Sequence, residues 1–202
     1  MPLIAKILPK KGDWLGIWEI TESEPELCQS LEKTELEQSK SIKADKKRME
    51  WLAVRNILDQ MLPGGKITYL DNGKPEIKEG FISLSHCYPY AVVYFSGSSP
   101  VGTDIEKKSE RILKIASRFL HPTDLNADQK SDIGLLTLIW CCKEAVFKKH
   151  GGDTVNFGTH IRIGHIDSEN HRVSVQITNE SAEKEEVLFY QLIGDFVLAY
   201  TQ

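Results

Sequence analysis

Apolar and polar positions alternate along many short stretches of the chain, a pattern typical of β-strands. These stretches are residues 3–8, 14–20, 66–70, 81–86, 91–95, 101–106, 161–166, 172–178, 187–193 and 196–200. Apolar residues at helical spacing occupy three other segments, residues 43–61, 112–119 and about 132–149. Helices mixed with antiparallel strands predict an α+β fold.

Glycine and proline clusters divide this pattern. Pro63-Gly64-Gly65 ends the first predicted helix, and Gly151-Gly152 ends the last one. Gly97-Ser98-Ser99-Pro100 has the composition of a linker, and α+β elements lie on both sides of it. We therefore predict two units of similar size, residues 1–100 and 101–202.

The composition is that of a globular protein, with 41% hydrophobic and 27% charged residues. Lys and Arg total 25 against 29 Asp and Glu, so the net charge is -4 and a general electrostatic affinity for nucleic acid is excluded. The N-terminal apolar run is too short for a signal peptide, and no run reaches membrane-spanning length. The four cysteines lack metal-ligand spacing. These features predict a cytoplasmic protein with reduced thiols that binds neither membrane nor nucleic acid.

Two carboxylates are candidates for metal binding. Asp104 and Glu106 lie two apart on a predicted strand, so both project from the same face. Carboxylates this close repel each other unless a cation lies between them, and Mg²⁺ prefers oxygen ligands. The pattern alone also occurs on solvent-exposed strands without any function.

A second charged group lies on the last predicted helix. Trp140, Glu144 and Lys148 are four residues apart and form one line along it. We expect Lys143 and Phe147 beside this line, on the face opposite the buried one. Such a line can complete a metal site and hold phosphate, whereas an exposed Glu–Lys pair of this spacing otherwise adds only about 0.2–0.5 kcal/mol to helix stability.

His86, preceded by Ser85, is placed at the end of a predicted strand and before the turn at Pro89. A histidine at this position can donate to a phosphate oxygen, although a single histidine is more often structural.

Taken together, these segments resemble the 4′-phosphopantetheinyl transferase family, in its two-lobed single-chain class typified by the surfactin-synthetase-activating enzyme. The segments that carry the resemblance are GKP (73–75), FISLSHC (81–87), VGTDIEK (101–107), IASRFLHPTDL (115–125) and WCCKEAVFK (140–148). The resemblance covers roughly residues 43–152.

The resemblance implies a pseudo-dimer of two α+β lobes with coenzyme A in the cleft between them. It implies that Asp104, Glu106 and Glu144 hold Mg²⁺ and that Lys148 contacts the coenzyme A phosphates. Glu144, or a metal-bound water that it orients, is the implied base.

The remaining implied contacts lie mostly in the N-terminal unit. His86 would donate to the pyrophosphate and Ser85 would fix the nucleotide end. Lys74 and Pro75 would lie by the adenine and the 3′-phosphate. Arg48 is the choice for a further contact to the 3′-phosphate, with Lys46 and Lys47 as alternatives.

The implied reaction is attack by a serine of an apo acyl or peptidyl carrier protein on the β-phosphorus of coenzyme A, which releases 3′,5′-ADP. The carrier could serve fatty-acid, polyketide or nonribosomal-peptide synthesis. Its acidic helix would meet a basic and apolar surface formed by Arg111, Lys114 and Arg118, with Phe119 and Leu120 nearby. A monomer suffices for a complete cleft. The alternatives are a Mg²⁺-dependent phosphoesterase or pyrophosphatase that uses the same carboxylates, and a non-catalytic coenzyme A-binding module.

Overall fold

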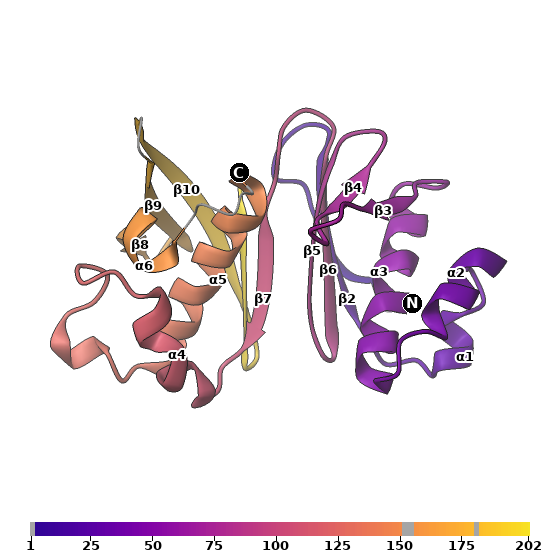
Figure 1. The fold of residues 1–202 in the computed structure, drawn as a ribbon, viewed down its shortest axis with the longest axis horizontal. Helices are drawn as coiled ribbons and strands as arrows, with labels where there is room; N and C mark the ends of the chain where they lie inside the picture. Colours follow the sequence, from indigo (N-terminus) through magenta and orange to yellow (C-terminus); the bar gives the residue numbers. More distant parts are fainter. Residues whose placement is uncertain (1–2, 151–155, 180–181) are drawn as a thin grey trace. The chain divides into compact units, whose positions relative to one another are not determined.

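A computed structural model describes residues 3–150, 156–179 and 182–202 (Figure 1). The chain forms two compact units, Met1–Pro100 and Val101–Gln202. Both units combine helices with antiparallel sheets, so the predicted α+β class is confirmed. Gly151-Gly152, which we expected to end a helix, lies outside the described residues.

The first unit is built on an antiparallel sheet with the strand order β1-β2-β6-β5. Its strands are β1 (Leu3–Ile7), β2 (Asp13–Glu19), β5 (Phe81–Cys87) and β6 (Tyr90–Ser96). A separate hairpin pairs β3 (Ile67–Tyr69) with β4 (Pro75–Ile77). The helices are α1 (Glu24–Leu27), α2 (Lys33–Ser39) and α3 (Asp45–Met61).

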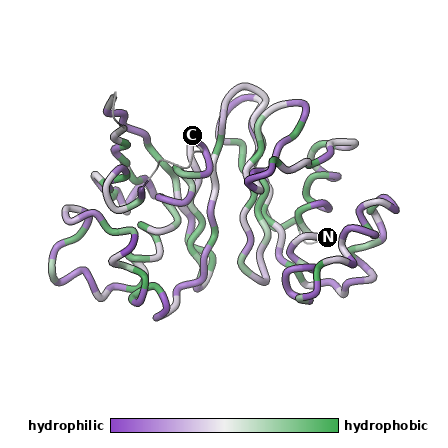
Figure 2. Tube along the Cα trace, in the orientation of Figure 1, coloured by the Kyte–Doolittle hydropathy of each residue, from purple (hydrophilic) through white to green (hydrophobic). Residues whose placement is uncertain are grey.

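Helix α3 packs across β6, β2 and β5 through its apolar side. Leu52 and Ile57 on this side are fully buried. A Cβ atom on Gly16 of β2 would lie 2.7 Å from Ile57 Cγ2, so the glycine permits the close approach of helix and sheet. Hydrophobic residues are concentrated along the strands, whereas α1 and α2 are largely hydrophilic (Figure 2). Burial of the apolar side of α3 therefore organises the core of this unit.

The second unit is built on an antiparallel sheet with the strand order β7-β11-β10-β9-β8. Its strands are β7 (Thr103–Lys107), β8 (Ile161–Asp167), β9 (Arg172–Asn179), β10 (Ala182–Ile193) and β11 (Phe196–Thr201). Its helices are α4 (Arg111–Phe119), α5 (Ile133–His150) and α6 (Phe157–His160), with a short 3₁₀ turn at Ala127–Gln129. Helix α5 packs against β7 and β11, and α4 packs against α5.

Glu186 of β10 ties the end of α5 to the sheet. Its carboxylate oxygens lie 3.0 Å from the Lys149 ammonium, 2.8 Å from His150 Nε2 and 2.7 Å from the Lys184 ammonium, with only 6% of its side chain exposed. Burial by itself would raise the pKa of Glu186, but these three donors outweigh burial and lower it to about 2. The carboxylate therefore stabilises the folded state only while it is ionised.

We expect Glu186→Gln to lower the free energy of unfolding by up to about 3 kcal/mol at pH 7. Because the pKa is lower in the folded state, this contribution is complete above the unfolded-state value of 4.5 and is lost as the pH falls toward about 2. Denaturant titrations of wild type and variant at pH 7 and pH 3 test this, with exposed Glu185→Gln as the control. A difference that is as large at pH 3 as at pH 7 would contradict it.

Candidate active site

Strand β7 and helix α5 pack closely because a glycine precedes the strand. A Cβ atom on Gly102 would overlap the carbonyl oxygen of Ala145, which is itself fully buried. The glycine of the VGTDIEK segment and the alanine of the WCCKEAVFK segment therefore face each other. This contact places the acidic face of β7 next to the polar side chains of α5.

Lys148 is bonded to Asp104 at this junction. Its ammonium donates to Asp104 Oδ1 at 2.7 Å and to the Thr103 carbonyl oxygen at 3.1 Å. Only 6% of the Asp104 side chain and 28% of the Lys148 side chain are exposed. Packing thus joins two predicted site residues that are 44 positions apart in the sequence.

Glu144 lies one turn before Lys148 and is half-buried. Burial raises the pKa of its carboxyl group to about 7, and the negative charges of Asp104 and Glu106 add to this rise while Lys148 opposes it. The three predicted carboxylates therefore act on one another electrostatically. Burial and this mutual repulsion together keep the charged form of Glu144 unfavourable in the absence of a cation.

The donor set of this group fits a hard divalent cation. Asp104, Glu106 and Glu144 offer carboxylate oxygens whose mutual repulsion a cation would relieve, and they are the residues that would hold Mg²⁺. Within residues 3–150, 156–179 and 182–202, no three His, Cys, Asp or Glu side chains converge as a preformed metal cluster. Asp104 is held by the Lys148 ammonium instead.

Lys143 does not flank Glu144 at the surface, so that prediction is wrong. The Lys143 side chain is completely buried, as is that of its partner Asp124, whose Oδ2 lies 2.6 Å from the ammonium. The ammonium also donates to the carbonyl oxygens of Phe119, Phe157 and Ile161 at 2.7, 3.0 and 2.6 Å. Lys143 is therefore an internal anchor that binds α5 to neighbouring segments.

Aromatic packing engages Trp140, which we expected on the charged line, and Phe147, which we expected beside it. Trp140 packs edge-to-face on Phe119 and Phe157, with ring centroids 5.1 and 5.7 Å apart. Phe147 packs on Phe157 in the same way at 5.2 Å. These rings hold α6 against α5 and leave Glu144 and Lys148 as the polar members of the line.

In the first unit, His86 is joined to a carboxylate that sequence reasoning missed. Glu50 of α3 is 7% exposed, and its Oε2 lies 3.0 Å from His86 Nδ1. Its Oε1 accepts from the backbone N–H of Tyr88 at 2.8 Å, and the Lys46 ammonium lies 5.2 Å from the centre of the Tyr88 ring. An acidic residue beside the apolar stripe of a helix, one turn after a lysine, is the sequence feature that could have revealed Glu50.

Arg48 lies outside this group. Its guanidinium donates to Glu24 and Asp45, each at 2.8 Å, and to the carbonyl oxygen of Ile42 at 2.8 Å. These bonds raise the pKa of Arg48 further and tie α3 to α1. Of the three candidates for the 3′-phosphate contact, Lys46 is the one that lies beside the His86 turn.

The other predicted coenzyme A contacts lie on β5 and on the β3–β4 hairpin. Ser85 is buried in β5 directly before His86. Lys74 is exposed in the turn of the hairpin, where its carbonyl oxygen accepts from the Leu70 N–H at 2.9 Å. Pro75 begins β4 and is paired with Tyr69.

Helix α4 carries the predicted acceptor surface. Arg111, Lys114 and Arg118 are all exposed on it. We predicted Phe119 at this surface, but it is fully buried in the core, so that prediction is wrong. Leu113, which is 41% exposed, supplies an apolar side chain between the basic residues instead.

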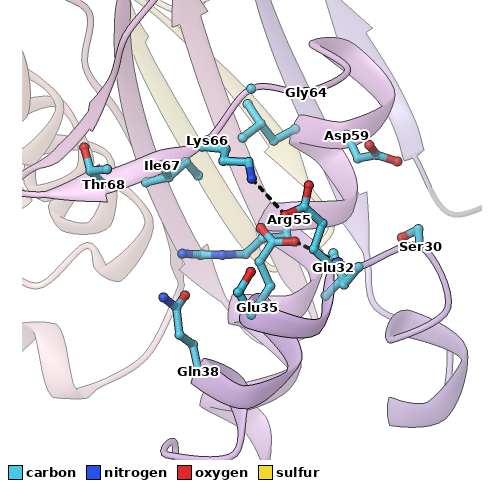
Figure 3. Close-up of a pocket in the computed structure, with 14 residues that line it drawn as sticks. Ser30, Glu32, Glu35, Gln38, Arg55, Asp59, Gly64, Lys66, Ile67 and Thr68 are labelled. Atoms are coloured by element: carbon cyan, nitrogen blue, oxygen red, sulfur yellow. Dashed lines mark hydrogen bonds and ion pairs between the residues drawn. The ribbon is translucent and has the colours of Figure 1, made fainter.

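A pocket of about 280 Å³ lies between α2, α3 and the start of β3, away from all the predicted site residues (Figure 3). Arg55 on its wall stacks on the Trp51 ring at 3.4 Å and donates to the Tyr69 hydroxyl at 3.2 Å. Lys66 at the rim is paired with Glu32 at 2.8 Å. Arg55 thus joins α3 to β3, and Lys66 joins the start of β3 to the start of α2.

The family model of the 4′-phosphopantetheinyl transferase superfamily matches residues 100–201, which is just over half of the chain. The chain belongs to this superfamily of transferases. The match includes β7 and α5, and with them Asp104, Glu106, Glu144 and Lys148. The chain has no significant match among curated proteins. In the described residues, no helix is long and apolar enough to span a membrane.

Proposed function

We propose that this protein transfers the 4′-phosphopantetheine arm of coenzyme A to a serine of an apo acyl or peptidyl carrier protein and releases 3′,5′-ADP. The observation that carries the proposal is the junction of Asp104, Glu144 and Lys148 within the segment that matches the superfamily. We also propose the two-lobed single-chain class, in which both units contribute contacts to one coenzyme A.

The proposed reaction forms a bond between the carrier serine oxygen and the β-phosphorus and breaks the bond from that phosphorus to the oxygen of 3′,5′-ADP. Such a transfer needs positioning and charge stabilisation more than covalent catalysis. Mg²⁺ held by Asp104, Glu106 and Glu144 would neutralise developing charge on the phosphate oxygens. Lys148 would exchange its bond to Asp104 for a phosphate oxygen, and Glu144, or a water that it orients, would take the serine proton.

The first unit would supply the contacts to the rest of coenzyme A. His86 would donate to the pyrophosphate, and Ser85 would fix the nucleotide end. Lys74 and Pro75 would lie by the adenine and the 3′-phosphate. We propose Lys46 rather than Arg48 for the second 3′-phosphate contact, because Arg48 is already bonded to two carboxylates.

The carrier would dock on α4. Its acidic helix would face the exposed Arg111, Lys114 and Arg118, with Leu113 as an apolar contact. We expect Arg118→Glu to raise the KM for the carrier about tenfold while the KM for coenzyme A changes less than twofold. Steady-state kinetics with each substrate varied in turn measure this, with exposed Lys130→Glu as the matched control. An unchanged carrier KM would contradict the docking surface.

The decisive experiment incubates the protein with coenzyme A, Mg²⁺ and an apo carrier protein and weighs the carrier by intact mass spectrometry. The proposal requires a Mg²⁺-dependent mass gain of one phosphopantetheine with equimolar release of 3′,5′-ADP. Cleavage of coenzyme A without a mass gain would identify a phosphoesterase or pyrophosphatase. Tight coenzyme A binding without either reaction would identify a binding module.

We further propose that the protein acts as a cytoplasmic monomer.

A further inference from the structure

We infer that Glu50 is a positioning residue that orients the His86 imidazole and makes it a hydrogen-bond donor to the pyrophosphate of coenzyme A. This inference rests on the proposed function, because it assigns Glu50 a part in the same coenzyme A site. Glu50 is in none of the short segments that carry the resemblance, and the family match begins only at residue 100.

The position of Glu50 follows from the packing of α3 on β5 and β6. Residue 50 lies on the side of α3 that meets the sheet, among buried apolar neighbours such as Leu52 and Ala53. A buried carboxylate in such surroundings is costly unless it is bonded. Both Glu50 oxygens are bonded, Oε2 to His86 Nδ1 at 3.0 Å and Oε1 to the Tyr88 N–H at 2.8 Å.

The contact fixes one edge of the imidazole and leaves the rest of the ring accessible. The Glu50 side chain is 9% exposed, whereas the His86 side chain is 46% exposed. The carboxylate therefore holds Nδ1 on the protein side, and the other ring nitrogen, Nε2, is left for a ligand. The second bond to Tyr88 anchors the same carboxylate to the turn after β5, so the ring and the turn are held together.

The chemistry of the pair decides what His86 can offer. A carboxylate accepts hydrogen bonds only, so the Nδ1 that faces it carries the proton. A phosphate oxygen also accepts only, so Nε2 must carry a proton when it contacts pyrophosphate. In that contact both ring nitrogens of His86 donate, Nδ1 to the Glu50 carboxylate and Nε2 to the phosphate oxygen. Lys46, beside Tyr88, adds positive charge at the same turn.

The test is a double-mutant cycle in the full chain, read as kcat/KM for coenzyme A. Glu50→Gln keeps the shape of the side chain and an oxygen for the Tyr88 N–H, but it removes the carboxylate oxygen that accepts from His86 Nδ1. We expect a loss of about tenfold, arising mainly in the KM for coenzyme A. In a His86→Ala background, Glu50→Gln should change kcat/KM by less than about twofold.

A structural role for Glu50 gives a different result, because its effect would then be the same with and without His86. An equal loss in both backgrounds, or no loss in either, overturns the inference. Glu37→Gln, which removes one exposed carboxylate of the same unit, is the matched control and should leave kcat/KM unchanged.

Nitrogen NMR of the histidine rings provides a second readout that does not depend on turnover. The His86 signals are assigned by their absence in His86→Ala, and we expect Nδ1 to carry a proton in the wild type and to lose this preference in Glu50→Ala. An Nδ1 without a proton in the wild type overturns the inference.

If the wild type transfers the arm but Glu50→Gln has no effect, only the inference fails. If the wild type neither transfers the arm nor binds coenzyme A in calorimetry, the proposed function fails as well.

Discussion

Glu144→Gln and Asp104→Asn are each expected to lower the transfer of phosphopantetheine about a thousandfold or more. Each change keeps the shape of the side chain but removes one negative charge from the group at the β7–α5 junction. The variant of Asp104 also weakens the 2.7 Å bond that orders Lys148. The group would then bind Mg²⁺ more weakly, and in the Asp104 variant the Lys148 ammonium would be less well positioned for the phosphates.

Carrier mass spectrometry over time measures this loss, and thermal unfolding verifies that each variant is folded. Asp128→Asn, an exposed acidic residue of the same unit, serves as the control and should retain wild-type rates. Chelation of divalent cations by EDTA should abolish transfer by the wild type, and added Mg²⁺ should restore it. Full activity of Asp104→Asn would overturn the metal assignment.

Lys143→Met is expected to have the largest effect on stability, a loss of about 3–5 kcal/mol in the free energy of unfolding. The change removes a buried ammonium and leaves the Asp124 carboxylate without its cation. It also leaves the carbonyl oxygens of Phe119, Phe157 and Ile161 without the Lys143 donor. Denaturant titration measures the loss.

Exposed Lys130→Met is the control and should change stability by less than about 0.5 kcal/mol. In a second variant, Lys143→Met is combined with Asp124→Asn, which removes the uncompensated charge while an amide oxygen can still accept from the Ile163 N–H. We expect this double variant to regain part of the stability. A double variant that loses the sum of the two single effects would show that Lys143 and Asp124 do not act as a pair.

The acidic segment before α3 illustrates what the sequence could predict only in part. Its many glutamates indicate contact with water, and only Leu27 and Ser39 of α1 and α2 are buried. Glu24 and Glu32, however, are bonded to Arg48 and Lys66, which come much later in the chain. Composition predicts that such residues are near water but not which cation each one meets.

The sequence by itself determined the α+β class, most strands, the three longest helices, and the charged residues that share one face of a strand or a helix. Local rules are sufficient for this. The two-residue period of a strand places Asp104 and Glu106 on one face, and the helical period aligns Glu144 with Lys148.

Only the tertiary structure decided which side of each element is buried and which distant residues meet. Helix α5 is buried around most of its circumference, so periodicity could not show that Lys143 faces inward to Asp124 while Glu144 lies within electrostatic reach of Asp104. The pairing of Glu50 with His86 likewise depends on how α3 lies on its sheet. Such contacts arise from long-range packing, and the overlap that Gly102 avoids with Ala145 exists only once β7 and α5 have come together.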